Sequence, residues 1–154
     1  MGFIESLSES VPVYMLLSSF FAGCASAGFA FCFFAAPKDI LTGGVCGFLG
    51  WFVYLLAKNL DMAVVISFGA AAFTAGVFSE ICAFLRRRPA LVFSVPGIIP
   101  LVPGGGMYET MMAAVRGNME EAGTRAFVTL CSAGAVAVGL AAATAVCRMI
   151  HRNR

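Results

Sequence analysis

The chain has 154 residues, of which 60% are hydrophobic and 12% are charged, and its mean hydropathy is +0.92. Soluble domains carry about 25% charged residues, so this composition excludes a soluble catalytic module and indicates an integral membrane protein. The net charge of +2 comes from residues at the ends of apolar runs, which favours orientation in a lipid bilayer over nucleic-acid binding.

Five apolar runs of spanning or near-spanning length account for most of the chain, and they predict a single all-α transmembrane domain over residues 1–154. The first ten residues contain no lysine or arginine, so we expect the first run to stay in the mature protein instead of being cleaved as a signal peptide. The expected spans are residues 12–36, 40–57, 62–85, 90–115 and 126–150, with residues 116–125 as the longest loop, a solvated turn.

Small residues recur at helical spacing in several runs, which lets two helices approach closely in lipid. They are Ala22, Ser26 and Ala30 in the first run, Gly43, Gly47 and Gly50 in the second, and two ridges in the last, formed by Ala133, Ala137, Ala141 and Ala145 and by Ala135, Gly139 and Ala143.

Aromatic residues in the first two runs suggest contact with lipid. Four phenylalanines in the first run are expected to face lipid or bulky neighbours, namely Phe29, Phe31, Phe33 and Phe34. Trp51 and Tyr54 approach the end of the second run, where amphipathic rings favour the membrane interface.

The cysteines suggest packing rather than metal or redox chemistry. None forms a C-x-x-C pair or lies near the single histidine, His151. We interpret them as small apolar residues between helices, and we expect no metal site and no cofactor. They are Cys24, Cys32, Cys46, Cys82, Cys131 and Cys147.

The fourth run is interrupted, because residues 95–106 contain three prolines and four glycines. Proline removes a backbone donor and blocks the preceding turn of a helix, so no continuous helix can pass Pro96, Pro100 and Pro103 undisturbed. In lipid, broken backbone is tolerated only where protein buries it or water fills a cavity beside it. The break is therefore the candidate functional site, and the alternative is a kink filled by neighbouring side chains.

After the break, the run is expected to resume as a half-helix that starts near Gly104. Its free N–H groups and positive dipole end would form a site for a carboxylate, and Tyr108 would add a hydroxyl group. Glu109 lies one or two turns after the break, where it either caps the free N–H groups or takes part in the chemistry. The predicted substrate-binding residues are Pro100, Pro103, Gly104, Gly105, Gly106, Tyr108 and Glu109.

Glu80 is the only acid well inside an unbroken apolar run, where a charged carboxylate is costly. Two interpretations remain open. Either Glu80 lies close enough to the helix end to reach the interface or the arginines at 86–88, or it takes part in ion coupling or substrate passage.

The distribution of cations predicts the orientation. If the broken run crosses the membrane, seven of the ten cations lie on one side, and the positive-inside rule places that side in the cytoplasm with the N-terminus outside. A re-entrant broken segment would give a weaker split of six against four, so we favour five spans and a cytoplasmic C-terminus. The seven are Lys38, Arg86, Arg87, Arg88, Arg148, Arg152 and Arg154, against Lys58, Arg116 and Arg125.

Residues 88–108, from Arg88-Pro89 through Pro100 and the Pro103-Gly104 pair to Tyr108, resemble the membrane part of the threonine/serine exporter family, especially its short, separately encoded members. The resemblance implies export of small polar metabolites across a bacterial inner membrane. These would be threonine and serine, or a dicarboxylate such as succinate, as in a two-component relative. It also implies a larger partner subunit of the same family, with a homo-oligomer as the alternative.

Two functions remain open on the sequence. In the first, the chain is a transporter subunit that binds a carboxylate-bearing substrate at the break. Because it has no nucleotide-binding motif, ion or proton coupling would drive it, and replacing Gly104 by leucine should abolish export. In the second, it is a non-transporting assembly partner. An enzyme is not expected, because no span contains histidine and Glu80 and Glu109 lie in different runs.

Overall fold

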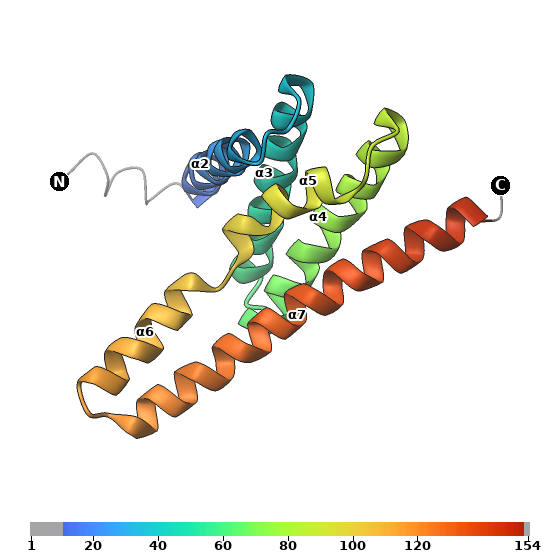
Figure 1. Ribbon diagram of the computed structural model, residues 1–154. Helices are drawn as coiled ribbons and strands as arrows, with labels where there is room; N and C mark the ends of the chain where they lie inside the picture. Colours follow the sequence, from blue (N-terminus) through green and yellow to red (C-terminus); the bar gives the residue numbers. More distant parts are fainter. Residues whose placement is uncertain (1–10, 153–154) are drawn as a thin grey trace.

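The computed structural model describes residues 11–152, and within this range every regular element is a helix (Figure 1). The prediction of an all-α fold is therefore confirmed. The elements in chain order are α2 (Val11–Cys32), α3 (Pro37–Asn59), α4 (Val64–Arg86), α5 (Leu91–Ile98), the 3₁₀ helix η1 (Ile99–Leu101), α6 (Gly104–Val115) and α7 (Met119–Arg152).

Four of these helices, α2, α3, α4 and α7, are each long and apolar enough to cross a membrane. A fifth candidate span is the pair formed by α5–η1 and α6, which is bent by 42° at the break. Five segments with the fourth one broken is the arrangement that the prolines predict, because α6 begins at Gly104, directly after Pro103.

The interface between α2 and α3 is made of small residues, as the spacing predicts. Ser26 and Ala30 of α2 are fully buried, and Gly43 of α3 faces Ala30 across it. A Cβ atom at Gly47 would overlap the side chain of Ser26, so only glycine fits there. The two backbones are therefore in the close contact that small residues allow in lipid.

Small residues also join α4 to α7. A Cβ atom at Gly76 would lie 2.7 Å from the Cβ of Ala143, and Gly139 faces the backbone of Gly69. Later residues of α4 thus meet later residues of α7, so the two helices run in the same direction. This parallel arrangement is the one expected if the broken segment carries the chain from one side of the membrane to the other.

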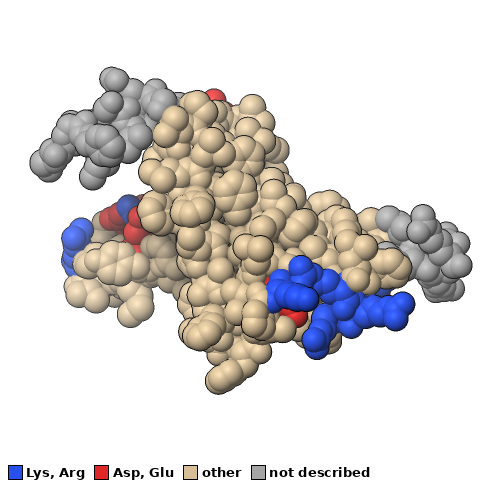
Figure 2. Space-filling view, turned by 90° about the horizontal axis from the view of Figure 1, so that it is seen from above, with Lys and Arg blue, Asp and Glu red and all other residues tan. Residues whose placement is uncertain are grey.

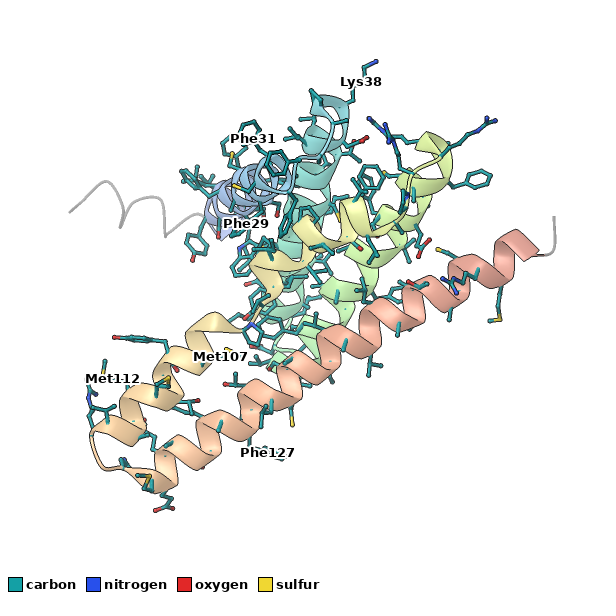
Figure 3. The ribbon with its side chains drawn as sticks, in the orientation of Figure 1. Phe29, Phe31, Lys38, Met107, Met112 and Phe127 are labelled. Carbon is teal, nitrogen blue, oxygen red and sulfur yellow. The ribbon has the colours of Figure 1, made fainter. Side chains whose placement is uncertain are left out.

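In the other ridge of α7, Ala137, Ala141 and Ala145 are exposed. These residues therefore lie outside the interface with α4. The phenylalanines at the end of α2 are also exposed, as expected for side chains that face lipid. Figure 3 shows Phe29 and Phe31 on the outside of α2 and Phe127 on the outside of α7.

The prediction that residues 116–125 form a loop was wrong, because α7 already begins at Met119. Asn118 caps it: the Asn118 Oδ1 atom accepts a hydrogen bond from the Glu121 N–H at 3.2 Å, and the Asn118 side-chain amide donates to Glu121 Oε2 at 2.9 Å. Such reciprocal capping stabilises a helix start, so the connection between α6 and α7 shrinks to Arg116–Asn118.

The end of α2 also differs from the expectation, since the helix stops at Cys32 and not at residue 36. Phe34 adopts a left-handed backbone φ of 56°, which a continuing α-helix does not permit. In Figure 1, α6 and the first part of α7 form a hairpin that projects from the bundle of α2 to α5.

Candidate functional site

The break lies later in the segment than its first proline. Pro96 is inside α5 and Pro100 is inside η1, while Pro103 occupies the position just before α6. No side chain caps α6, and its first N–H groups have no partners within the helix. The turn is closed by a hydrogen bond from the Gly104 N–H to the Val102 carbonyl at 2.7 Å.

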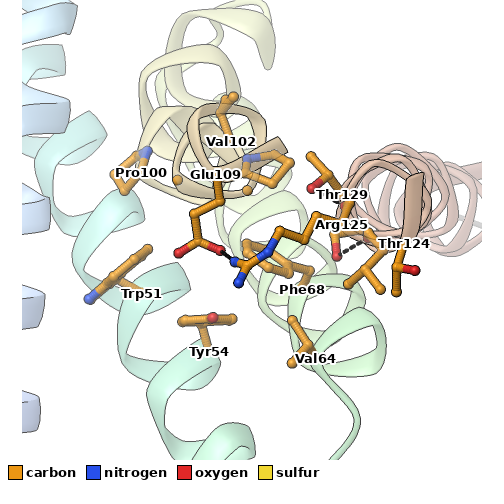
Figure 4. Close-up of a pocket in the computed structure, with 15 residues that line it drawn as sticks. Trp51, Tyr54, Val64, Phe68, Pro100, Val102, Glu109, Thr124, Arg125 and Thr129 are labelled. Atoms are coloured by element: carbon orange, nitrogen blue, oxygen red, sulfur yellow. Dashed lines mark hydrogen bonds and ion pairs between the residues drawn. The ribbon is translucent and has the colours of Figure 1, made fainter. Parts of the chain in front are cut away.

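A cavity of about 440 Å³ lies at this break, between α3, α4, η1, α6 and α7 (Figure 4). Its size is within the range of about 300–1,000 Å³ that is typical of small-molecule sites. The lining residues are Trp51, Tyr54, Val64, Phe68, Pro100, Val102, Pro103, Gly105, Gly106, Glu109, Thr124, Arg125, Val128, Thr129 and Ser132.

An ion pair connects the two helices of the projecting hairpin within this cavity. Glu109 of α6 binds the Nη1 atom of Arg125 of α7 (Figure 4). Arg125 also donates to Glu121, one turn earlier in α7, with Nη2 and Nε at 2.7 and 2.9 Å from Oε1. One guanidinium group is thus shared by two carboxylates. All three side chains keep between 41% and 58% exposure, so the pairs can exchange partners.

Two hydroxyl groups of α7 are placed against the α6 side of the cavity. Thr129 and Ser132 are 7% and 2% exposed, and each hydroxyl donates to the carbonyl one turn earlier, at 2.7 and 2.8 Å. Because the donor of each group is used, the remaining lone pairs are acceptors. Gly106 packs directly on Thr129, since a Cβ at Gly106 would overlap the Thr129 Oγ1 atom.

The opposite wall is aromatic. The rings of Trp51 and Tyr54 lie 5.1 Å apart between centroids, and Tyr54 lies 4.6 Å from Phe68. The Trp51 indole N–H donates to the Ser18 hydroxyl at 2.9 Å, which fixes the orientation of the ring. Aromatic faces attract cations such as a substrate ammonium group. The sequence had suggested only a membrane-interface position for Trp51 and Tyr54.

Five of the seven predicted binding residues line the cavity, namely Pro100, Pro103, Gly105, Gly106 and Glu109. Gly104 is not among them and has open space where a side chain would lie. Tyr108 is 65% exposed and does not line this cavity, but it shares a second hollow, between α6 and α7, with Arg116 and with the Glu109–Arg125 pair.

Glu80 lies apart from this cavity. It is half-buried in α4 and shares a smaller hollow with Arg88, Cys147 and Arg148. The structure thus brings it toward the basic residues at the helix ends, as one of the two interpretations expected.

Among the polar residues of the cavity, Arg125, Thr129 and Ser132 were not predicted from the sequence as binding residues. Arg125 was missed because it was assigned to a loop, whereas Thr129 and Ser132 lay inside the predicted span 126–150 with no signal that they face the break. Once α7 is known to begin at Met119, positions 125, 128, 129 and 132 fall on one face of the helix. The signal in the sequence was the Asn118 and Glu121 pair, which has the spacing of a helix cap.

A helical membrane protein with a charged and partly aromatic cavity at a discontinuous helix has the architecture of a transporter. Residues 18–146 match the family described as "Threonine/Serine exporter, ThrE", so the chain belongs to the threonine/serine exporter family. The resemblance found around the break is therefore confirmed, and with it membership of a family of transporters rather than enzymes.

A curated relative, "Threonine/serine exporter" from Corynebacterium glutamicum, is 29% identical over 156 residues. The match covers 94% of this chain but only 30% of the relative, so the chain spans less than a third of that protein's length. No solved structure matches the chain.

Proposed function

We propose that the chain is part of an exporter of small zwitterionic amino acids, and that the cavity at the break binds the substrate. The observation that carries this proposal is the exposed Glu109–Arg125 pair inside a cavity at a broken transmembrane segment. Ionisable residues within transmembrane segments are rare and typically face a water-filled cavity or a substrate pathway.

The charges of the cavity favour an amino acid over a dicarboxylate. Among its lining residues, Arg125 is the cation and Glu109 is the anion. A zwitterion offers one carboxylate and one ammonium group and matches both. Succinate would place one carboxylate on Arg125 and leave the other near Glu109, where like charges repel. The acceptor lone pairs of Thr129 and Ser132 suit a substrate hydroxyl group, such as that of serine or threonine.

Substrate binding would proceed by exchange of ion-pair partners. The substrate carboxylate replaces Glu109 on Arg125, while Glu121 keeps the guanidinium group in position. Glu109, once released, receives the substrate ammonium group. The free N–H groups at the start of α6 lie at Gly105 and Gly106 in the cavity lining, and they add positive potential for the carboxylate.

The complete exporter would contain more than this chain. The length of the relative supports a larger family subunit as the partner, with a second copy of the chain as the alternative. Alternating access then arises when one unit rocks against the other around the cavity, driven by an ion or proton gradient. Glu80 is the candidate coupling residue. The N-terminus lies outside and the C-terminus in the cytoplasm of a bacterial inner membrane.

Efflux assays in the host strain test this proposal, because any partner is then present. Cells that lack the chromosomal copy are complemented with wild type, Arg125→Gln, Glu109→Gln or the control Arg116→Gln, and loaded with threonine, serine or succinate. We expect wild type and the control to export both amino acids, and each cavity variant to lose export by about tenfold or more.

Three other outcomes would contradict the proposal, each in a different part. Export of succinate by the wild type would contradict the assignment of substrate class. Full activity of Arg125→Gln and Glu109→Gln would remove the cavity from the mechanism. If the chain is needed only for the abundance of its partner, and purified partner exports without it, the chain is an assembly subunit and not a transporter.

A further inference from the structure

The end of the bundle opposite the cavity is strongly basic. Lys38 lies in the first turn of α3, and Arg86 ends α4 with Arg87 and Arg88 directly after it. Two acids lie among these cations: Asp39 pairs with Arg86 and Arg88, and Glu80 shares a hollow with Arg88 and Arg148. Figure 2 shows lysine and arginine side chains gathered beside a small acidic area at one edge of the molecule, and Lys38 points away from the end of α3 in Figure 3.

Asp39 neutralises only part of this charge. Its side chain is 7% exposed and lies 3.2 Å from Arg86 Nη1 and 4.0 Å from Arg88 Nε. Arg86 also donates to the Lys38 carbonyl at 2.8 Å, which fixes it against α3. Arg88 is held less tightly and keeps 59% exposure. The cluster therefore presents an excess of positive charge, most accessibly at Arg88.

A mostly apolar groove has Arg88 and its ion-pair partner Asp39 as the charged residues of its lining. It has a volume of about 710 Å³ and runs between the residues that follow α2 and the first two turns of α5. Phe33, Phe34, Leu91 and Val95 line it and are between 37% and 95% exposed. A cation at the head of an apolar groove complements a molecule with an anionic head and a hydrocarbon tail.

We propose that this groove binds an anionic phospholipid, with the phosphate group on Arg88 and an acyl chain along α5. Basic pockets between transmembrane helices on the cytoplasmic side bind anionic lipid headgroups, and the cytoplasmic leaflet is rich in them. The orientation proposed above places this end of the bundle in that leaflet. A soluble phosphate compound would leave the apolar part of the groove without a function.

Lipid retention by the purified protein tests this assignment. The protein is equilibrated with equal amounts of phosphatidylglycerol and phosphatidylcholine that carry the same acyl chains, and bound lipid is counted by native mass spectrometry. We expect wild type to retain phosphatidylglycerol preferentially, and Arg88→Gln to reduce this preference by about fivefold. Arg88→Lys should keep most of it, which also controls for a folding defect in the glutamine variant.

Two further variants separate a site from general attraction. Arg116→Gln removes the same charge at the other end of the molecule and should leave retention unchanged. Val95→Trp fills the groove without changing charge and should reduce retention. If Arg116→Gln and Arg88→Gln have equal effects, the lipid responds only to overall charge. If Val95→Trp has no effect, no acyl chain lies in the groove. Either result overturns the assignment.

A photo-crosslinking amino acid at Leu91 identifies the occupant in cells. The side chain of Leu91 is 68% exposed in the groove. We expect a lipid adduct in the membrane fraction. A specific adduct with another protein chain would show that a partner helix occupies the groove, and it would overturn the proposal.

Discussion

The two ends of the molecule use charge in opposite ways. At the basic end, the buried carboxylate of Asp39 is shared by Arg86 and Arg88. At the cavity end, Arg125 is shared by Glu109 and Glu121, and all three side chains are substantially exposed. A buried acid with two partners holds helices together, because leaving it unpaired is costly. An exposed pair contributes little stability and exchanges easily.

Packing also differs between the two halves of the broken segment, α5 and α6. In α5, Phe93 is fully buried, and Gly97 packs so closely on Cys46 of α3 that a Cβ atom would overlap the thiol. In α6, by contrast, most side chains are exposed or half-buried, Ala113 being the buried one, and the helix packs chiefly against α7. The first half of the segment is thus fixed in the bundle and the second half is not, which makes the break at Val102–Pro103 the natural hinge.

The largest effect is expected at Gly106, where α6, the loosely packed second half of the broken segment, contacts α7. Gly106→Leu would place a side chain on Thr129 and push α6 away from the hydroxyl groups of the cavity. Overpacking of this kind typically costs about 1–3 kcal/mol, so we expect threonine export to fall by about tenfold or more. The loss is measured as the rate of threonine efflux from loaded cells.

Gly104→Leu is the matched control, because it adds the same side chain two residues earlier into open space. It should retain most of the export. This reverses the expectation from sequence alone, in which Gly104 was the sensitive glycine. Equal loss in both variants would mean that glycine matters here for backbone freedom and not for the contact with α7.

Much of the architecture could be predicted because it depends on local chemistry. The prolines at 96, 100 and 103 cannot be accommodated in one straight helix, and the small residues of α2, α3 and α7 recur at the spacing of helix interfaces. Such signals lie within one segment and need no knowledge of the tertiary structure.

The charged partners could not be predicted in this way. Asp39 and Arg86 are 47 positions apart, and Glu109 and Arg125 are 16 apart on different helices. Which acid meets which cation depends on how the helices cross. For Arg125 a local error also contributed, because a missed cap at Asn118 turned a cavity residue into a loop residue.

An intermediate effect is expected at the basic end. Asp39→Asn removes the carboxylate that accepts a hydrogen bond from Arg86 and lies 4.0 Å from Arg88, and one hydrogen bond to a charged group contributes about 1.5–3 kcal/mol. With about 2–4 °C per kcal/mol for a chain of this size, the apparent Tm in detergent should fall by about 3–12 °C. Asp61→Asn is the control: Asp61 is exposed with a φ of 55°, which asparagine also tolerates, so its Tm should not change.

A smaller effect is expected at Thr129, and it concerns selectivity more than rate. Thr129→Val keeps the shape of the side chain but removes the acceptor that we assign to the substrate hydroxyl. A neutral hydrogen bond contributes about 0.5–1.5 kcal/mol, so the preference for serine over alanine should fall by about 2- to 10-fold. Competition between the two amino acids in the efflux assay measures this ratio. An unchanged ratio would place the substrate side chain elsewhere in the cavity.

The smallest effect is expected at Glu121, which holds Arg125 from within the same helix. Glu121→Gln keeps a hydrogen-bond acceptor near Arg125 but removes one of its two negative partners, and exposed i,i+4 pairs contribute only about 0.3–0.5 kcal/mol. Export should therefore fall by less than about threefold, whereas the same change at Glu109 abolishes most of it. If Glu121→Gln instead matches Glu109→Gln, both carboxylates act on the substrate. The cavity would then be anionic overall, and a cationic substrate would fit it better than a zwitterion.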